Sequence, residues 1–94
     1  MDQTARDDAL RLLRAAKDIF LEQHGRSAEL FREGADLDLV EAGNRIGLGV
    51  GLPRHNAAVQ WLGDQDAIVE ELTCNVVNVP AYRVTVHGVE LAGP

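Results

Sequence analysis

Hydrophobic residues in the first quarter of the chain recur with the spacing of an α-helix. The pattern predicts a helix over residues 4–24, beginning at Thr4, and Gly25 is a natural stop for it. Thr4 followed by Asp7 resembles a capping box in which Asp takes the place of the usual Glu. The apolar face of this helix, which we expect to lie in the core, contains Ala9, Leu12, Leu13, Ala16, Ile19 and Phe20.

Two further leucines of this helix, Leu10 and Leu21, lie beside the apolar face and widen it. A face wider than one small core needs has two explanations. The leucines pack within the domain, or they contact a second copy of the chain or another protein. The sequence leaves both explanations open.

Two shorter helical segments are expected next. Ser27–Gly34 reads as a single helical turn, with its first residue as the cap and its last as the terminator. A helix is predicted over Leu39–Ile46, and Asp36 or Asp38 would cap its N-terminus. The small residues Ala42 and Gly43 in this helix would let another helix approach closely.

A glycine-rich turn, Gly47–Gly51, separates that helix from the next one. The following helix is predicted over Pro53–Leu62, because proline suits the first turn of a helix and the apolar residues again have helical spacing. With 100° of rotation per residue, the inward face contains His55, Ala58, Val59 and Leu62. The outward face contains Pro53, Arg54, Asn56, Ala57, Gln60 and Trp61.

The last third of the chain has the pattern of a β-hairpin, over residues 67–87. Ile68–Leu72 can form a short strand, with a helical extension as the alternative, and Tyr82–Val86 alternates well and is rich in β-branched residues. The tip of the ribbon would be Thr73–Pro80, and Thr85–Glu90 would close it. The order of elements predicts a single α+β domain, residues 1–94, with three to four helices and a C-terminal two-stranded ribbon.

Composition restricts the class of protein. The chain has 94 residues, 46% of them hydrophobic, which is enough for one small core. No apolar run approaches the roughly 20 residues that span a bilayer, and the charged N-terminus lacks the pattern of a signal peptide. A single cysteine, Cys74, excludes an internal disulfide. We therefore expect a cytoplasmic protein that has no membrane partner.

The charge is unevenly distributed. The formal net charge is −6, which argues against a strong nonspecific interaction with nucleic acid phosphates. Between Ala42 and Gly63, however, the chain has no acidic residue and carries Arg45, Arg54 and His55. On the predicted outward face, Arg, Asn and Gln are the side chains that make bidentate contacts to guanine and adenine. Arg54, Asn56 and Gln60 are therefore candidates for contacting base edges in DNA.

Other candidate chemistry is weaker. His55 on an inward face is typical of a hydrogen-bonded packing residue, and His24 and His87 have no paired ligand at metal-binding spacing. Nothing cationic lies beside Cys74 in the sequence to activate its thiol. The turn Gly47–Gly51 follows a helix rather than a strand and lacks the Lys-Ser/Thr of a phosphate-binding loop. We expect no cofactor, no metal and no enzymatic activity.

Three segments together resemble the winged helix-turn-helix domains of bacterial and archaeal transcription regulators. They are Glu41–Leu48, which ends in Gly-Leu; Val59–Leu62, with Ile68 downstream; and Tyr82–Leu91, which contains Thr-x-x-Gly. The resemblance covers roughly residues 38–91. It implies a helix-turn-helix over residues 38–62, with the helix 53–62 in the DNA major groove and a wing over residues 67–87.

The first functional hypothesis is a DNA-binding transcription regulator. Arg54, Asn56 and Gln60 would contact base edges, and Arg45 and Arg83 would contact phosphates from the first motif helix and the wing. A homodimer formed through the N-terminal helix would place two recognition helices about one DNA turn apart. Double-stranded DNA is the partner that this hypothesis requires.

The alternative is an acidic winged-helix module that binds another protein and does not bind DNA. Its motivation is the net charge of −6 and the wide apolar face with Leu10 and Leu21. This hypothesis predicts a hetero-complex that depends on these leucines and changes little with salt, whereas a DNA complex weakens steeply as salt rises.

Overall fold

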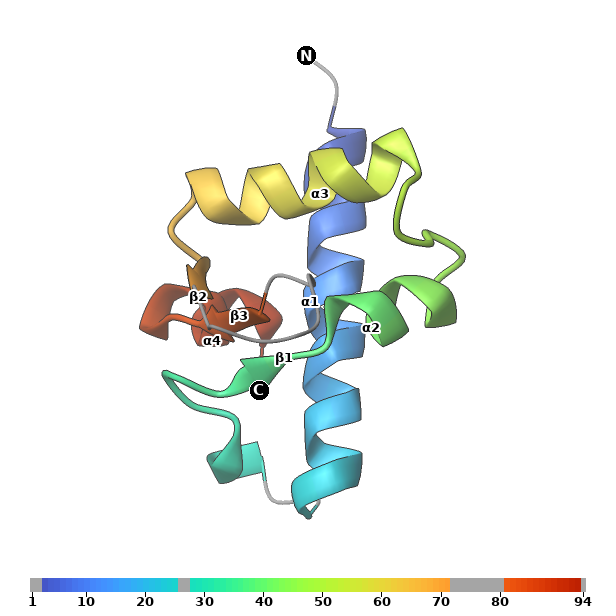
Figure 1. Ribbon diagram of the computed structural model, residues 1–94. Helices are drawn as coiled ribbons and strands as arrows, with labels where there is room; N and C mark the ends of the chain where they lie inside the picture. The colour runs from blue at the N-terminus through green and yellow to red at the C-terminus, as the bar shows by residue number, and fades with distance from the viewer. Residues whose placement is uncertain (1–2, 26–27, 72–80, 94) are drawn as a thin grey trace.

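The computed structural model describes residues 3–25, 28–71 and 81–93, and Figure 1 shows their arrangement. In chain order the elements are α1 (Thr4–His24), η1 (Ala28–Leu30), β1 (Asp36–Leu37), α2 (Leu39–Arg45), α3 (Pro53–Asp64), β2 (Ile68–Glu71), β3 (Ala81–Val84) and α4 (Val86–Ala92). Within this part of the chain, four α-helices and a three-stranded antiparallel sheet make a small α+β fold. The coarse class predicted from the sequence is confirmed.

The long helix α1 is the spine on which the other elements pack (Figure 1). The predicted apolar face is confirmed, since Ala9, Leu12, Leu13, Ala16 and Ile19 are buried. The helix ends at Gly25, whose φ of 106° favours glycine. The predicted capping box is wrong, because Thr4 is already helical and the N-cap is Gln3, whose side chain makes no capping hydrogen bond. None of the described helices is long and apolar enough to cross a membrane.

The segment from α2 to α3 follows the prediction closely. Asp38 caps α2 by accepting a hydrogen bond from the backbone N–H of Glu41 at 3.0 Å. The close approach expected at Gly43 is confirmed. A Cβ atom there would overlap the carbonyl oxygen of Leu48 and come within 3.0 Å of His55 Nδ1 on α3. Glycine is therefore what allows α2, the turn and α3 to pack together.

The sheet contains one strand more than the predicted ribbon. Its order is β1-β3-β2, and β1 pairs with β3 through Asp36 opposite Arg83 and Leu37 opposite Tyr82. Asp36 is therefore a strand residue rather than a cap. A two-residue strand carries no alternation of its own, and only pairing with distant β3 defines it. The strand alternative is the correct one for β2, which pairs with β3 from Ile68 opposite Val84 onward.

The C-terminal end of the ribbon differs from the prediction. The last strand stops at Val84, and the next residues form α4 instead of continuing the strand to Val86. Thr85 caps α4 by accepting a hydrogen bond from Gly88 N–H at 3.0 Å, and its hydroxyl also donates to the carbonyl oxygen of Asp66. The cap outweighs the β-branched pattern that favoured a strand. The predicted wing tip, Thr73–Pro80 with Cys74, lies outside the described residues.

The segment between α1 and β1 also departs in detail from its predicted single helical turn. The described part of Ser27–Gly34 contains the short 3₁₀ helix η1, and Ser27 lies outside the described residues. Phe31, which follows η1, is buried in the core and meets Phe20 edge to face, with ring centroids 5.8 Å apart. The C-terminal end of the chain is joined to α1 by a hydrogen bond. Lys17 Nζ on α1 donates to the Gly93 carbonyl oxygen at 2.7 Å and holds the end of α4 against α1.

Candidate functional site

Arg54, a predicted base-contacting residue on α3, forms an ion pair with Asp8 on α1. Its Nε donates to Asp8 Oδ2 at 2.9 Å and its Nη2 donates to Asp8 Oδ1 at 2.8 Å. Asp8 lies on α1 and is only 2% exposed. The hydrogen bonds and the charge of Asp8 raise the pKa of the Arg54 guanidinium above its usual value. A buried carboxylate requires such a partner, so Arg54 joins α3 to α1.

Arg45, a predicted phosphate contact on α2, is also held by acidic side chains. Both of its terminal nitrogens donate to the carboxylate of Glu22 on α1. Its Nε lies 3.6 Å from Glu41, four residues earlier on the same helix. The hydrogen bonds that Arg45 donates to Glu22, followed by the charges of both glutamates, raise the pKa of Arg45. The positive charge at this end of α2 is therefore balanced within the chain.

Arg83, the predicted phosphate contact in the wing, interacts with residues in and just before the neighbouring strand β1. Its Nη1 donates to the Gly34 carbonyl oxygen at 2.8 Å and lies 3.4 Å from the carboxylate of Asp36, its cross-strand neighbour. Each of the three arginines that the sequence assigned to DNA thus has a carboxylate partner in the same chain.

The structure separates the predicted base-contacting residues from one another. Asn56 and Gln60 are exposed one turn apart on α3, and both line a groove bounded by α1, β1, α2, α3 and β3. Arg54 instead reaches the opposite way, to Asp8 on α1. The two amides and the arginine therefore do not form one continuous reading surface.

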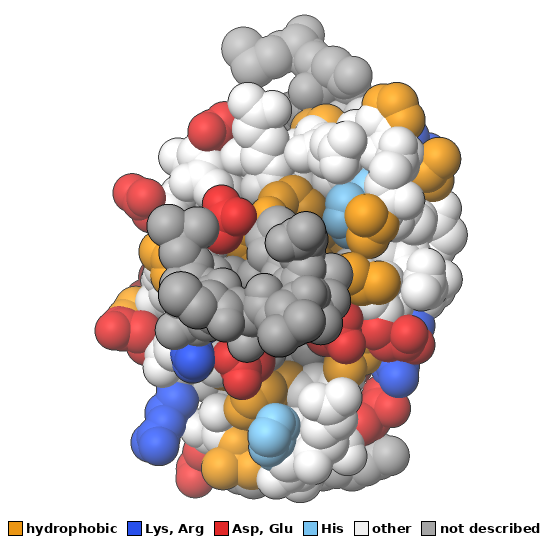
Figure 2. All heavy atoms as spheres, viewed as in Figure 1, with side chains coloured by type: hydrophobic (Ala, Val, Ile, Leu, Met, Phe, Trp, Pro, Cys, Tyr) orange, Lys and Arg blue, Asp and Glu red, His pale blue; other side chains and the backbone are white. Residues whose placement is uncertain are grey.

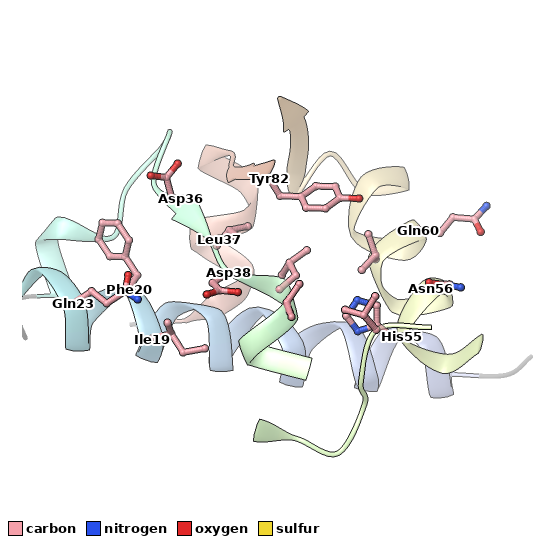
Figure 3. Close-up of a pocket in the computed structure, with 14 residues that line it drawn as sticks. Ile19, Phe20, Gln23, Asp36, Leu37, Asp38, His55, Asn56, Gln60 and Tyr82 are labelled. Carbon is pink, nitrogen blue, oxygen red and sulfur yellow. The ribbon is translucent and has the colours of Figure 1, made fainter. Parts of the chain in front are cut away.

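The groove has a volume of about 580 Å³ and is mostly apolar (Figure 3). Its lining side chains come from both ends of the chain. They are Ile19, Phe20, Gln23, Asp36, Leu37, Asp38, Leu39, Val40, Val50, His55, Asn56, Val59, Gln60 and Tyr82. The sequence identified several of these as core or surface residues, but only β1 pairing with β3 brings them to one cavity.

His55 lies at the α3 side of this groove and is 5% exposed (Figure 3). Its Nδ1 faces the Leu48 carbonyl oxygen at 2.9 Å, and because a carbonyl only accepts, Nδ1 carries the proton. The other ring nitrogen, Nε2, is then an acceptor with no partner among the described residues. No fully buried side-chain nitrogen or oxygen among the described residues lacks a partner, so Nε2 is not fully buried, and His55 is one of the residues that line the groove.

Hydrophobic side chains are exposed around the same region. Val40 on α2 and Val50 in the turn line the groove and are 42% and 59% exposed, and Leu52 beside them is 47% exposed. Figure 2 shows hydrophobic side chains gathered over the α2–α3 side of this face. We call Val40, Val50 and Leu52 the apolar rim.

Tyr82 forms part of the groove wall. Burial, followed by the nearby charge of Glu70, raises the pKa of its hydroxyl.

The predicted dimer or partner face on α1 is less exposed than the sequence implied. Leu10 and Leu21 are both half-buried, and Leu21 packs against the hydrophobic core. Packing within the domain accounts for part of the extra width of the apolar face. A homodimer or partner contact through these leucines remains a prediction.

Comparisons with known proteins add no assignment. No protein-family model matches the chain, and neither a curated protein nor a solved structure is detectably similar to it. Within the described residues, no group of three or more His, Cys, Asp or Glu side chains is placed to hold a metal ion. The groove and the three arginine ion pairs are therefore the features from which a function has to be argued.

Proposed function

We propose that this chain is a winged-helix module that binds another protein and does not read DNA. The order α1, β1, α2, α3, β2, β3 and the strand order β1-β3-β2 support the winged-helix part of the proposal. In this proposal α2 and α3 are the helix-turn-helix, and β2 and β3 are the strands of the wing. The protein-binding part rests on charge.

The observation that carries the proposal is the engagement of Arg45, Arg54 and Arg83 by carboxylates. Phosphate contacts supply most of the nonspecific affinity for DNA, and they need cations that are free to replace counterions. An arginine that is already paired must first give up its carboxylate. For Arg54, this would leave the buried Asp8 without its bidentate partner.

The surroundings of α3 point in the same direction. Asp36, Asp38 and Glu41 lie near the start of α2, Asp64 is the last residue of α3, and Asp66 follows it. With a net charge of −6, the approach of a phosphate backbone is disfavoured. The apolar rim offers instead the exposed hydrophobic surface that protein partners bury.

The test is a selection of bound fragments from a pool of random DNA duplexes at low salt. We expect no enriched sequence with the wild-type protein. A release variant, Asp8→Asn/Glu22→Gln/Asp36→Asn, removes the negative charge from one carboxylate partner of each arginine and should gain DNA affinity. The matched control Asp7→Asn/Asp18→Asn/Asp64→Asn makes the same change in net charge at acids outside these three pairs. It should gain less, because the arginines stay paired.

DNA reading is the second candidate, and one observation favours it. Asn56 and Gln60 are exposed at the i, i+4 spacing from which two amides can reach neighbouring bases. An enriched motif that is lost in Asn56→Ala/Gln60→Ala would establish this candidate and reject the first. Arg54→Ala is a poor test, because it also breaks the ion pair between α3 and α1.

A further inference from the structure

We infer that the groove beside α3 receives a segment of the partner protein in which apolar side chains stand next to Lys or Arg. The inference rests on the proposed function, because it takes the occupant to be a protein. It adds the chemistry of that partner and the place where it binds.

The walls and the size of the groove account for the apolar half of this preference. Leu37, Leu39 and Ile19 form buried parts of the wall, and Val40 and Val50 extend it to the surface. A volume of about 580 Å³ lies within the range of roughly 300–1,000 Å³ that is typical of ligand pockets. Burying apolar side chains here would cover the exposed valines.

The polar atoms at the groove account for the cationic half. His55 is only 5% exposed, and its Nε2 is an acceptor with no partner among the described residues, so it calls for an N–H or O–H donor. Asp38 accepts one hydrogen bond, from the Glu41 backbone, and no Lys or Arg in the described part of the chain pairs with its carboxylate. A Lys or Arg side chain has only donors, on an apolar stem that suits the walls.

Charge complementarity selects a basic segment over an acidic one. The described lining includes Asp36 and Asp38 but no Lys or Arg. Asp36 is partly balanced by Arg83 at 3.4 Å, so Asp38 contributes most of the negative charge. Phe20 and Tyr82 add aromatic faces, which attract cations. An acidic segment, like a DNA phosphate, would meet only like charge.

The experiment uses three designed peptides of about 14 residues, roughly four helical turns. One is an amphipathic helix with Leu along one face and Lys along the other. The second replaces every Lys with Glu, and the third replaces every Leu with Ser. Binding to the full chain is followed by backbone amide shifts in nuclear magnetic resonance spectra. We expect the Leu–Lys peptide to bind about tenfold more tightly than either control and to shift residues that line the groove.

Two substitutions at exposed positions test the site. Asp38→Asn keeps a capping side chain and removes the charge, and should weaken the Leu–Lys peptide about threefold. Val40→Lys, at an exposed position on the rim, should weaken it further by adding a like charge to the groove. Asp64→Asn removes an exposed acid outside the groove and should have no effect.

Four results would overturn the inference: equal binding of the Leu–Glu or Ser–Lys peptide, shifts that map away from the groove, no binding, or equal weakening by Asp64→Asn. The small aromatic amine tryptamine is titrated in parallel, and its binding without binding of the Leu–Lys peptide would also overturn the inference and identify a site for small amines. The DNA selection decides the proposed function separately. An enriched DNA motif rejects the proposed function whatever the peptides do. If no DNA motif is enriched and no peptide binds the groove, only this inference is rejected.

Discussion

The polar groups on the two sides of α3 differ in whether they have hydrogen-bond partners within the chain. On the side that faces α1, Arg54 and Asp8 satisfy each other through two hydrogen bonds. On the groove side, Asn56 and Gln60 are exposed, and His55 has one ring nitrogen bonded to Leu48 and the other without a partner among the described residues. One helix thus has a side that is closed by ion pairing and a side that is open for binding.

The difference teaches which charged residues are available to a partner. An arginine on a predicted outward face suggests recognition, but its neighbours decide whether it is free. Here the paired arginines hold the helices together, and the acceptors remain accessible. The groove side is therefore the better place to look for a ligand, and it offers the acceptors His55 Nε2 and the Asp38 carboxylate beside the amides of Asn56 and Gln60.

The largest expected effect comes from breaking the closed side. Arg54→Ala leaves the buried Asp8 carboxylate without its bidentate partner, and the one other cation paired with it in the described part of the chain is Arg11 at 3.9 Å, so stability should fall strongly. Asp8→Ala removes the buried charge itself and should cost less, about 1–2 kcal/mol. Urea denaturation of both single variants and the double variant measures this. Equal losses in the two single variants would mean that the burial of Asp8 does not matter.

The next effect comes from breaking the support of the open side. Gly43→Ala places a methyl group against the Leu48 carbonyl oxygen and the His55 ring, and overpacking of this kind costs about 2 kcal/mol. Gly63→Ala is the matched control, because a Cβ atom there meets nothing within 4 Å and the residue lies in α3. It should stabilise the fold by about 0.5–1 kcal/mol. Thermal unfolding would refute the packing argument if both substitutions changed stability in the same direction.

The smallest expected effect concerns the groove wall. Tyr82 is the only tyrosine, so the absorbance of tyrosinate during an alkaline titration reports on it alone. Burial, followed by the charge of Glu70, raises the pKa of Tyr82 above the usual 10.0, so its hydroxyl should ionise at a higher pH in the folded than in the unfolded chain. The folded state then keeps a proton that the unfolded state loses. This contribution to stability is full below pH 10.0 and is lost as the pH rises through the folded pKa.

Tyr82→Phe should remove this alkaline dependence of stability. Glu70→Gln should lower the pKa of Tyr82 only slightly, because burial is the larger cause. A Tyr82 that titrates at the ordinary value would show that the groove wall is well hydrated. Such a result would weaken the argument that the groove favours apolar side chains.

Elements with a strong hydrophobic period were predicted well from the sequence, whereas elements that exist through pairing with distant residues were not. The stripe from Ala9 to Ile19 reports burial of α1 because every third or fourth residue lies on one face. Gly43 was identified because only a small residue allows close helix packing. By contrast, β1 has two residues and exists through Asp36 opposite Arg83, which no local pattern reveals. Thr85 had the chemistry of a cap, but the β-branched residues around it favoured a strand.

The candidate site divides in the same way. The sequence determined which side chains α3 buries, because the helical period places His55, Ala58 and Leu62 on one face, whereas Trp61, predicted outward, is half-buried against the core. It also determined the acidic balance of the chain. Only the tertiary structure decided that Arg54, Arg45 and Arg83 meet Asp8, Glu22 and Asp36, and that β1, α2 and α3 enclose a groove. The physical reason is that ion pairs and cavities depend on residues 23 to 47 positions apart, whose proximity is set by packing and not by local spacing.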